Sequence, residues 1–420
     1  AHSRHASGSV RKTSPPNSTM STCPTAIANR IRKNSRHPRR QEKTEWRVSK
    51  PLALNIFQNC RNTNVEKKSV NWRTVSPPVV IVHQNSMPSN TATMIMPHVK
   101  SVRAMARVMM NSLRGRGFSS ITSGLGGSEA IDLTIRAVVQ PGDEVIIPEP
   151  CFVCYEPITQ LTGGVPVHIA TRAEDQFRLT ADQLRAAITP RTKLLIFPYP
   201  NNPTGAVMSA AEMEEIAAVL RETNVLVLSD EIYSELTYGL DRHVSIASLP
   251  GMAERTIVVN GFSKSYAMTG WRLGWAMGPK ELMRHICKIH QFGIMSAPTT
   301  AQFAGIEAIR TGDDDIARMR DQYDLRRRYL LGELRSMGLE CFEPEGAFYI
   351  FPSIESTGLS SEEFCERLLH EQEVAVIPGS AFGASGEGHI RISYSYSMSH
   401  LREACSRMKI FLENLKQEQK

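Results

Sequence analysis

Long apolar runs are missing from this chain of 420 residues, and none reaches the roughly 18 residues that a membrane-spanning helix needs. The chain also does not open with the basic, apolar and small-residue pattern of a secretory signal. Its eight cysteines are few and irregularly spaced, which fits reduced thiols better than a disulfide framework. Cys151 and Cys154 have the spacing of a redox motif, but no second pair or nearby histidine supports a metal site. We therefore expect a cytoplasmic protein with no membrane contact and no bound metal, in which these two thiols are ordinary.

Acidic residues are almost missing from the first 120 positions, which hold 21 Lys and Arg but only three Asp and Glu, a net charge of +18. The remaining 300 residues carry 28 basic and 39 acidic residues, a net charge of −11. Residues 1–120 also contain no tyrosine and show little periodic apolar patterning. Three interpretations are open: a disordered basic arm or organellar extension, a DNA-binding module, or a segment whose reading frame is wrong.

From residue 121 onward, short apolar strands alternate with amphipathic helices. We expect strands at residues 144–148, 165–169, 193–197, 225–228 and 256–259, and helices at 126–139, 180–188 and 210–222. Continuous apolar strands that alternate with helices indicate a mainly parallel sheet covered on both faces. A long charged helix over about 313–338 then leads to a second unit, as expected for a chain long enough to form at least two domains.

The stretch NGFSKSYAMTGWRLG at residues 260–274 directly follows the apolar strand 256–259. A lysine just beyond a strand end, with an arginine eight residues later, suits an enzyme that holds a phosphorylated aldehyde covalently. The amine of Lys264 would form a Schiff base, and the guanidinium of Arg272 would bind the phosphate. One lysine and one arginine in a loop are by themselves more often solvated. The whole stretch, however, resembles the pyridoxal-phosphate lysine motif of the class I and II aminotransferases, which are aspartate-aminotransferase-like enzymes of fold type I.

Residues 126–128, with the sequence GGS, precede a predicted helix. Glycines let backbone N–H groups approach an anion, and the helix dipole favours a phosphate at this end. Such a sequence is usually only a turn and a helix cap. The resemblance implies that Gly127 and Ser128 bind the cofactor phosphate.

Two further motifs carry predicted cofactor residues. Phe152 lies in PCFVCY at residues 150–155, and Asn202 lies in NNPTG at residues 201–205. Alone, Phe152 would be a core residue and NNPTG a generic turn. The resemblance implies that the Phe152 ring stacks on the cofactor pyridine, and that Asn202 donates to the cofactor ring oxygen and contributes to the substrate site.

The motif SDEIY at residues 229–233 follows the predicted strand 225–228. A carboxylate at the end of a buried strand is costly unless it meets a cation, and a protonated pyridine nitrogen would supply one. Asp230 would keep that nitrogen protonated so that the ring can draw electrons. The alternative for Asp230 is a helix N-cap. The Tyr233 hydroxyl would reach the cofactor ring oxygen.

Arg391 lies in HIRIS at residues 389–393, after a glycine-rich turn. A strand arginine is commonly part of a surface ion pair. The resemblance implies instead that Arg391 binds the substrate α-carboxylate, which its planar fork matches.

The resemblance covers residues 121–420, and its motifs occur in the family's order. It implies an α/β fold of the type I pyridoxal-phosphate transferases and a homodimer. The large cofactor-binding domain would span residues 121–312 on a mainly parallel seven-stranded sheet, and a smaller α/β C-terminal domain would span 313–420. The implied reaction moves an amino group between an L-amino acid and a 2-oxo acid, with Lys264 as general base and acid.

Residues 1–120 do not contain the family's N-terminal substrate-binding segment, nor the tyrosine motif that reaches the partner's cofactor phosphate. This absence favours the wrong-frame interpretation.

Two other functions are alternatives: a C–S lyase-like enzyme on the same fold, and a transcription regulator that joins a basic winged-helix module to an aminotransferase-like sensor domain. No helix–turn–helix period precedes residue 100, so nucleic-acid binding is not expected. The sequence does not identify the amino donor or the acceptor. It also does not determine organellar targeting or whether the chain as written is active.

Overall fold

The computed structural model of the protein describes residues 120–239 and 243–419. The three interpretations of the basic N-terminal segment therefore fall outside the described residues, except at Ser120. No helix within the described ranges is long and apolar enough to cross a membrane.

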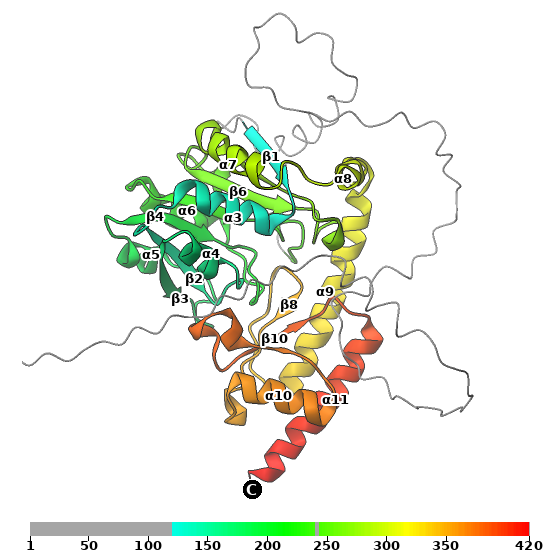
Figure 1. The fold of residues 1–420 in the computed structure, drawn as a ribbon. Helices are drawn as coiled ribbons and strands as arrows, with labels where there is room; N and C mark the ends of the chain where they lie inside the picture. The colour runs from blue at the N-terminus through cyan, green and yellow to red at the C-terminus, as the bar shows by residue number, and fades with distance from the viewer. Residues whose placement is uncertain (1–119, 240–242, 420) are drawn as a thin grey trace, which may run out of the picture. The chain divides into compact units, whose positions relative to one another are not determined.

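The larger of two sheets has seven strands in the order β1-β7-β6-β5-β4-β2-β3. Figure 1 labels β1, β6, β4, β2 and β3 of this sheet. The strands are β1 (Ser120–Gly124), β2 (Glu144–Glu149), β3 (Val165–Ala170), β4 (Thr192–Phe197), β5 (Leu226–Asp230), β6 (Thr256–Gly261) and β7 (Gly274–Gly278). Neighbouring strands run parallel except at β7, which pairs antiparallel with both β1 and β6. The predicted mainly parallel seven-stranded sheet is confirmed.

Helices cover both faces of this sheet, because its central strands bury apolar side chains in both directions. In β2, Val145 and Ile147 pack into one core cluster with α3 and α7, whereas Ile146 packs into another with α5 and α6. The helices are α3 (Gly127–Val138), α4 (Tyr155–Leu161), α5 (Ala181–Ala187), α6 (Ala210–Arg221) and α7 (Lys280–Gly293). The predicted burial of both faces is confirmed.

Local sequence explains where several helices begin and end. Thr180 and Gln183 form a capping box at the start of α5, since each side chain accepts a hydrogen bond from the other residue's backbone N–H. The predicted charged helix is α9 (Asp313–Ser336), with three aspartates in its first turn and an arginine in its last, which complement the helix dipole.

The second sheet has three short antiparallel strands in the order β8-β10-β9. These strands are β8 (Tyr349–Ile350), β9 (Ile377–Pro378) and β10 (Ile390–Ser393). Strands β8 and β10 share an apolar core with α9, α10 (Ser361–Gln372) and α11 (Met398–Glu418). Helix α8 (Thr299–Thr311) precedes α9. The assignment of residues 121–312 and 313–420 to two domains stays a prediction.

Candidate active site

Four predicted site residues follow parallel strands of the larger sheet. Phe152 follows β2, Asn202 follows β4, Asp230 ends β5 and Lys264 follows β6. Since the carboxyl ends of parallel strands meet at one edge, the fold brings these residues to that edge. Strand β1 points the same way as β6, because both run antiparallel to β7 between them, so the start of α3 lies at this edge too.

Lys264 is half-buried in a hydrogen-bonded turn after β6. The backbone N–H of Ala267 donates to the Lys264 carbonyl at 3.1 Å. Its ammonium nitrogen lies 5.7 Å from the ring centroid of Tyr233 and 5.5 Å from that of Phe348. The fold thus brings Lys264 and Tyr233 together. Phe348, which was not predicted, is a second aromatic ring beside the Lys264 amine.

Asp230 is only 6% exposed. The Tyr155 hydroxyl donates to its Oδ2 at 2.7 Å, and the Ile232 backbone N–H donates to its Oδ1 at 3.2 Å. Burial raises the pKa of Asp230 to about 6, although the Tyr155 hydrogen bond and the positive charge of Lys264 act to lower it. The helix N-cap alternative is wrong, because a turn follows Asp230 rather than a helix. Phe152 joins this group through an edge-to-face contact with Tyr155 at 5.9 Å between ring centroids.

Arg391 connects the second sheet to the strand ends of the first. Its Nη1 donates to Asn202 Oδ1 at 2.9 Å. Its guanidinium carbon lies 4.5 Å from the ring centroid of Tyr349 and 4.7 Å from that of Phe382. Arg391 Nε is a buried donor without a hydrogen-bond partner among the described residues. The surface ion-pair alternative is therefore wrong, and one donor of this arginine is available to a carboxylate.

Two tyrosine hydroxyls link the surroundings of Lys264 and Arg391. Tyr233 and Tyr349 are hydrogen-bonded at 3.0 Å between their hydroxyl oxygens. Burial and the neighbouring Tyr349 hold the pKa of Tyr233 well above its ordinary value, so its hydroxyl stays protonated and can donate. Tyr349 was not predicted; its position within the aromatic run GAFYIF was the only local signal.

The start of α3 lies against Arg272. Gly126, the N-cap, has a φ of 95°, and a Cβ built there would lie 2.9 Å from Arg272 Nη2. The two guanidinium Nη atoms donate at 3.0 Å to the carbonyls of Thr269 and Leu125. Gly127 and the exposed Ser128 form the first turn, whose N–H groups have no partner within the helix. A helix N-terminus beside a guanidinium is suited to an anion.

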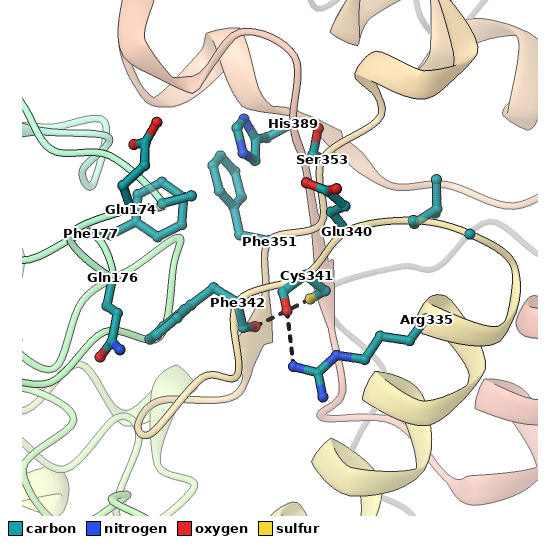
Figure 2. A pocket seen from close by; sticks show the side chains of 13 residues that line it. Glu174, Gln176, Phe177, Arg335, Glu340, Cys341, Phe342, Phe351, Ser353 and His389 are labelled. Carbon is teal, nitrogen blue, oxygen red and sulfur yellow. Dashed lines mark hydrogen bonds between the residues drawn. The ribbon is translucent and has the colours of Figure 1, made fainter.

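One cavity and one possible metal-binding group contain none of the predicted site residues. A cavity of about 660 Å³ is lined by Phe177, Phe351 and His389, among others, and by none of the predicted site residues (Figure 2). Glu149, Glu156 and His168 could hold a metal ion, since their ligand atoms lie within 4.8 Å of one another. The closest contact, 2.7 Å between His168 Nδ1 and Glu149 Oε1, joins two of these side chains to each other.

The cysteines near Phe152 form no disulfide. All six cysteines within the described ranges are free, and burial raises the pKa of both the Cys151 and Cys154 thiols. Protonated thiols are poor nucleophiles, which fits the expectation that this pair is ordinary.

Comparison with known proteins shows that the chain is similar to aminotransferases. The family profile described as "Aminotransferase class I and II" matches residues 98–408, and so starts upstream of residue 121, where the motifs begin. YugH of Bacillus subtilis is 52% identical over 288 residues, which cover 69% of this chain and 74% of YugH. Aspartate aminotransferase of Pyrococcus abyssi is 42% identical over 76% of this chain and 83% of its own length. The crystal structure of an aromatic aminotransferase from Pyrococcus horikoshii superposes with a TM-score of 0.73 at 42% identity, over 75% of this chain and 86% of that chain.

Proposed function

Because this chain belongs to the class I and II aminotransferases and is itself an aminotransferase, we propose that it uses pyridoxal 5′-phosphate bound to Lys264. The substrates would be an L-amino acid and a 2-oxo acid. When bound, this cofactor supplies an aldehyde that takes up the amino group and a protonated ring that draws electrons from the substrate α-carbon. The following assignments concern what the residues of the chain contribute.

The buried Asp230 carboxylate carries the proposal. Among the described residues, no Lys, Arg or His is within salt-bridge distance of it, although it is almost fully buried. A buried carboxylate is stable when it is paired with a cation, and a protonated pyridine nitrogen would complete such a pair. Tyr155 orients the carboxylate through its hydrogen bond. The residues at this position therefore fit the cofactor ring.

The start of α3 fits the cofactor phosphate. Gly127 and Ser128 offer N–H groups and a hydroxyl, and Arg272 adds a positive charge beside them. Arg272 is exposed, and its two Nη atoms already donate to backbone carbonyls. Part of its attraction for the phosphate would therefore be long-range electrostatic rather than a direct hydrogen bond. Phe152 would stack on the ring from one face, and Asn202 and Tyr233 would donate to the ring oxygen.

The reaction requires a base that can take the α-proton of the substrate and return it. Lys264 would fill this role, as both general base and general acid. Arg391 would hold the substrate α-carboxylate with its free Nε and the stacked guanidinium plane, while Asn202 fixes the position of the guanidinium. The rings of Tyr349 and Phe382 keep water away from this arginine and strengthen its attraction for a carboxylate.

We further propose a cytoplasmic homodimer. The end of α7 and the residues after it expose three large apolar side chains, Phe292, Ile294 and Met295, with Phe292 84% exposed. Adjacent apolar side chains of this size are typical of an interface. The free cysteines support a reducing compartment. Sedimentation velocity would test the dimer: Phe292→Ser with Met295→Ser should shift the protein to a monomer, and an unchanged sedimentation coefficient would contradict this interface.

Visible absorption of the purified protein with pyridoxal phosphate tests the reaction. We expect a yellow band that bleaches when L-glutamate or L-aspartate is added, with one donor acting faster. Lys264→Ala should lack the band and lose turnover by about three orders of magnitude or more. Lys288→Ala, which changes an exposed lysine of α7, should behave as the wild type. A band that persists in Lys264→Ala but not in Lys288→Ala would show that Lys264 is not the attachment point.

A further inference from the structure

Leu125, in the loop between β1 and α3, is held by hydrogen bonds on both sides. Its N–H donates to Glu129 Oε2, and its carbonyl accepts from Arg272 Nη2 at 3.0 Å. Glu129 lies in the first turn of α3, whereas Arg272 follows β6 far along the chain. The backbone just before the proposed phosphate site is thus fixed by two oppositely charged side chains from different elements.

Glu129 is itself fixed by a third element. Its Oε1 lies 2.8 Å from Nδ1 of His290, a residue of α7 that is only 4% exposed. Burial acts to raise the pKa of Glu129, but the hydrogen bonds from His290 and from the Leu125 amide hold it below its ordinary value, so the carboxylate stays charged. Both carboxylate oxygens are therefore engaged in holding the loop and the helix.

The loop is built around this carboxylate. A Cβ built on Gly124 would lie 2.5 Å from Glu129 Oε2, so a side chain at this position would displace the carboxylate. A glutamate in a first turn that accepts a nearby N–H is a common way to start a helix without any ligand. Here, however, the carboxylate also bonds to a buried histidine of another helix, which a local cap does not require.

The negative charge of Glu129 would repel a phosphate bound at the start of α3, so its place here needs a compensating structural role. Because Glu129 takes up the Leu125 amide, the N–H groups that remain for an anion are those of the first turn of α3. We propose that Glu129 and His290 are positioning residues that set the loop at residues 124–127 for the cofactor phosphate. This inference rests on the proposed function, because it presumes that the phosphate binds at the start of α3.

Comparison of two ligands on the cofactor-free protein tests the inference. Pyridoxal phosphate and pyridoxal differ only in the phosphate, so the ratio of their dissociation constants measures what the phosphate site contributes. We expect Glu129→Ala and His290→Ala to weaken pyridoxal phosphate about tenfold, the effect of one lost hydrogen bond to a charged group, while pyridoxal changes less than about twofold. Glu129→Gln and His290→Asn, which keep an acceptor and a donor, should recover part of the ratio.

His285→Asn is the matched control, since His285 is an exposed histidine on the same helix and its change should leave the ratio unaltered. A thermal melt of each protein shows which variants fold, and the conservative variants serve if an alanine variant does not. If the affinities for pyridoxal phosphate and pyridoxal fall by the same factor, Glu129 and His290 have only a structural role and the inference is overturned. If the wild type prefers pyridoxal phosphate but every variant keeps that ratio, the inference is also overturned. If the wild type itself shows no preference for the phosphate, the phosphate assignment under the proposed function fails instead.

Discussion

The Tyr155 hydroxyl donates a 2.7 Å hydrogen bond to the carboxylate of Asp230, a residue 75 positions further along the chain. This bond acts against the rise in the pKa of Asp230 that burial causes. Tyr155→Phe removes the donor and should therefore leave Asp230 more often protonated near neutral pH. We expect pyridoxal phosphate to bind about five- to tenfold more weakly to Tyr155→Phe, as measured by absorption titration at pH 7. Tyr329→Phe, a change in α9 beside the core of the second sheet, should not alter the affinity; an equal loss in both variants would contradict the role of Tyr155.

Asp230 should make the stability of the cofactor-free protein depend on pH. Its pKa is raised from an ordinary value of 3.8 to about 6, so between these values the folded state binds more protons than the unfolded state. The free energy of unfolding should accordingly fall as the pH rises from about 4 to about 6, by roughly 3 kcal/mol at most. Urea unfolding of the wild type and of Asp230→Asn across this range measures the difference. Parallel pH curves for the two proteins would show that Asp230 does not titrate in this way.

Arg391→Lys should change substrate binding more than the chemical step. Lysine keeps the charge but loses the planar fork, the hydrogen bond to Asn202 and the stacking on Tyr349 and Phe382. We expect KM for the amino acid to rise about tenfold or more, with a smaller effect on kcat and an unchanged cofactor spectrum. Steady-state kinetics with Arg367→Lys, a half-buried arginine of α10 paired with Glu371, provides the reference. A fall in kcat with an unaltered KM would place Arg391 outside the substrate site.

Two glycine substitutions should have opposite effects. At Gly274 in β7, an added Cβ would lie 2.4 Å from the carbonyl carbon of Gly126, and backbone at this position has no room to move aside. Gly274→Ala should lower the free energy of unfolding by about 1–3 kcal/mol and weaken cofactor binding, because it displaces the start of α3. Gly332 lies on the exposed side of α9 with no neighbouring atom within 4 Å, so Gly332→Ala should raise stability by about 0.5–1 kcal/mol. Chemical unfolding and cofactor titration of both variants check this pair.

Much of the fold could be predicted because its strands and turns follow local rules. Strand β2 is entirely buried and ends before a proline, and the turn at Pro141 and Gly142 marks its start. Strands β1 and β7 were not predicted, since β7 has only five residues, begins and ends with a glycine, and shows no periodic pattern. Its antiparallel direction follows only from its pairing with β6 and β1.

The candidate site could be predicted only where a residue lies in a recognisable motif. Asp230 ends one apolar strand, and Asn202 and Lys264 come within a few residues of the ends of two others, so their common location follows from the direction of the strands. Tyr155 and His290 offered no such signal, because each acts through a contact with a residue distant in the sequence. A tyrosine at the start of a helix looks the same whether it faces a carboxylate or the core.

Arg391 belongs to the three-stranded sheet, whereas Lys264 follows a strand of the seven-stranded sheet. Under the proposed roles, recognition of the substrate carboxylate and attachment of the cofactor are therefore carried by separate scaffolds that meet at Asn202. Substitutions in β10 can then change how the substrate carboxylate is held, whereas Tyr349 of β8 also affects the surroundings of Lys264 through its hydrogen bond to Tyr233. The relative placement of the two sheets therefore decides whether one substrate can meet the Arg391 guanidinium and the Lys264 amine at the same time.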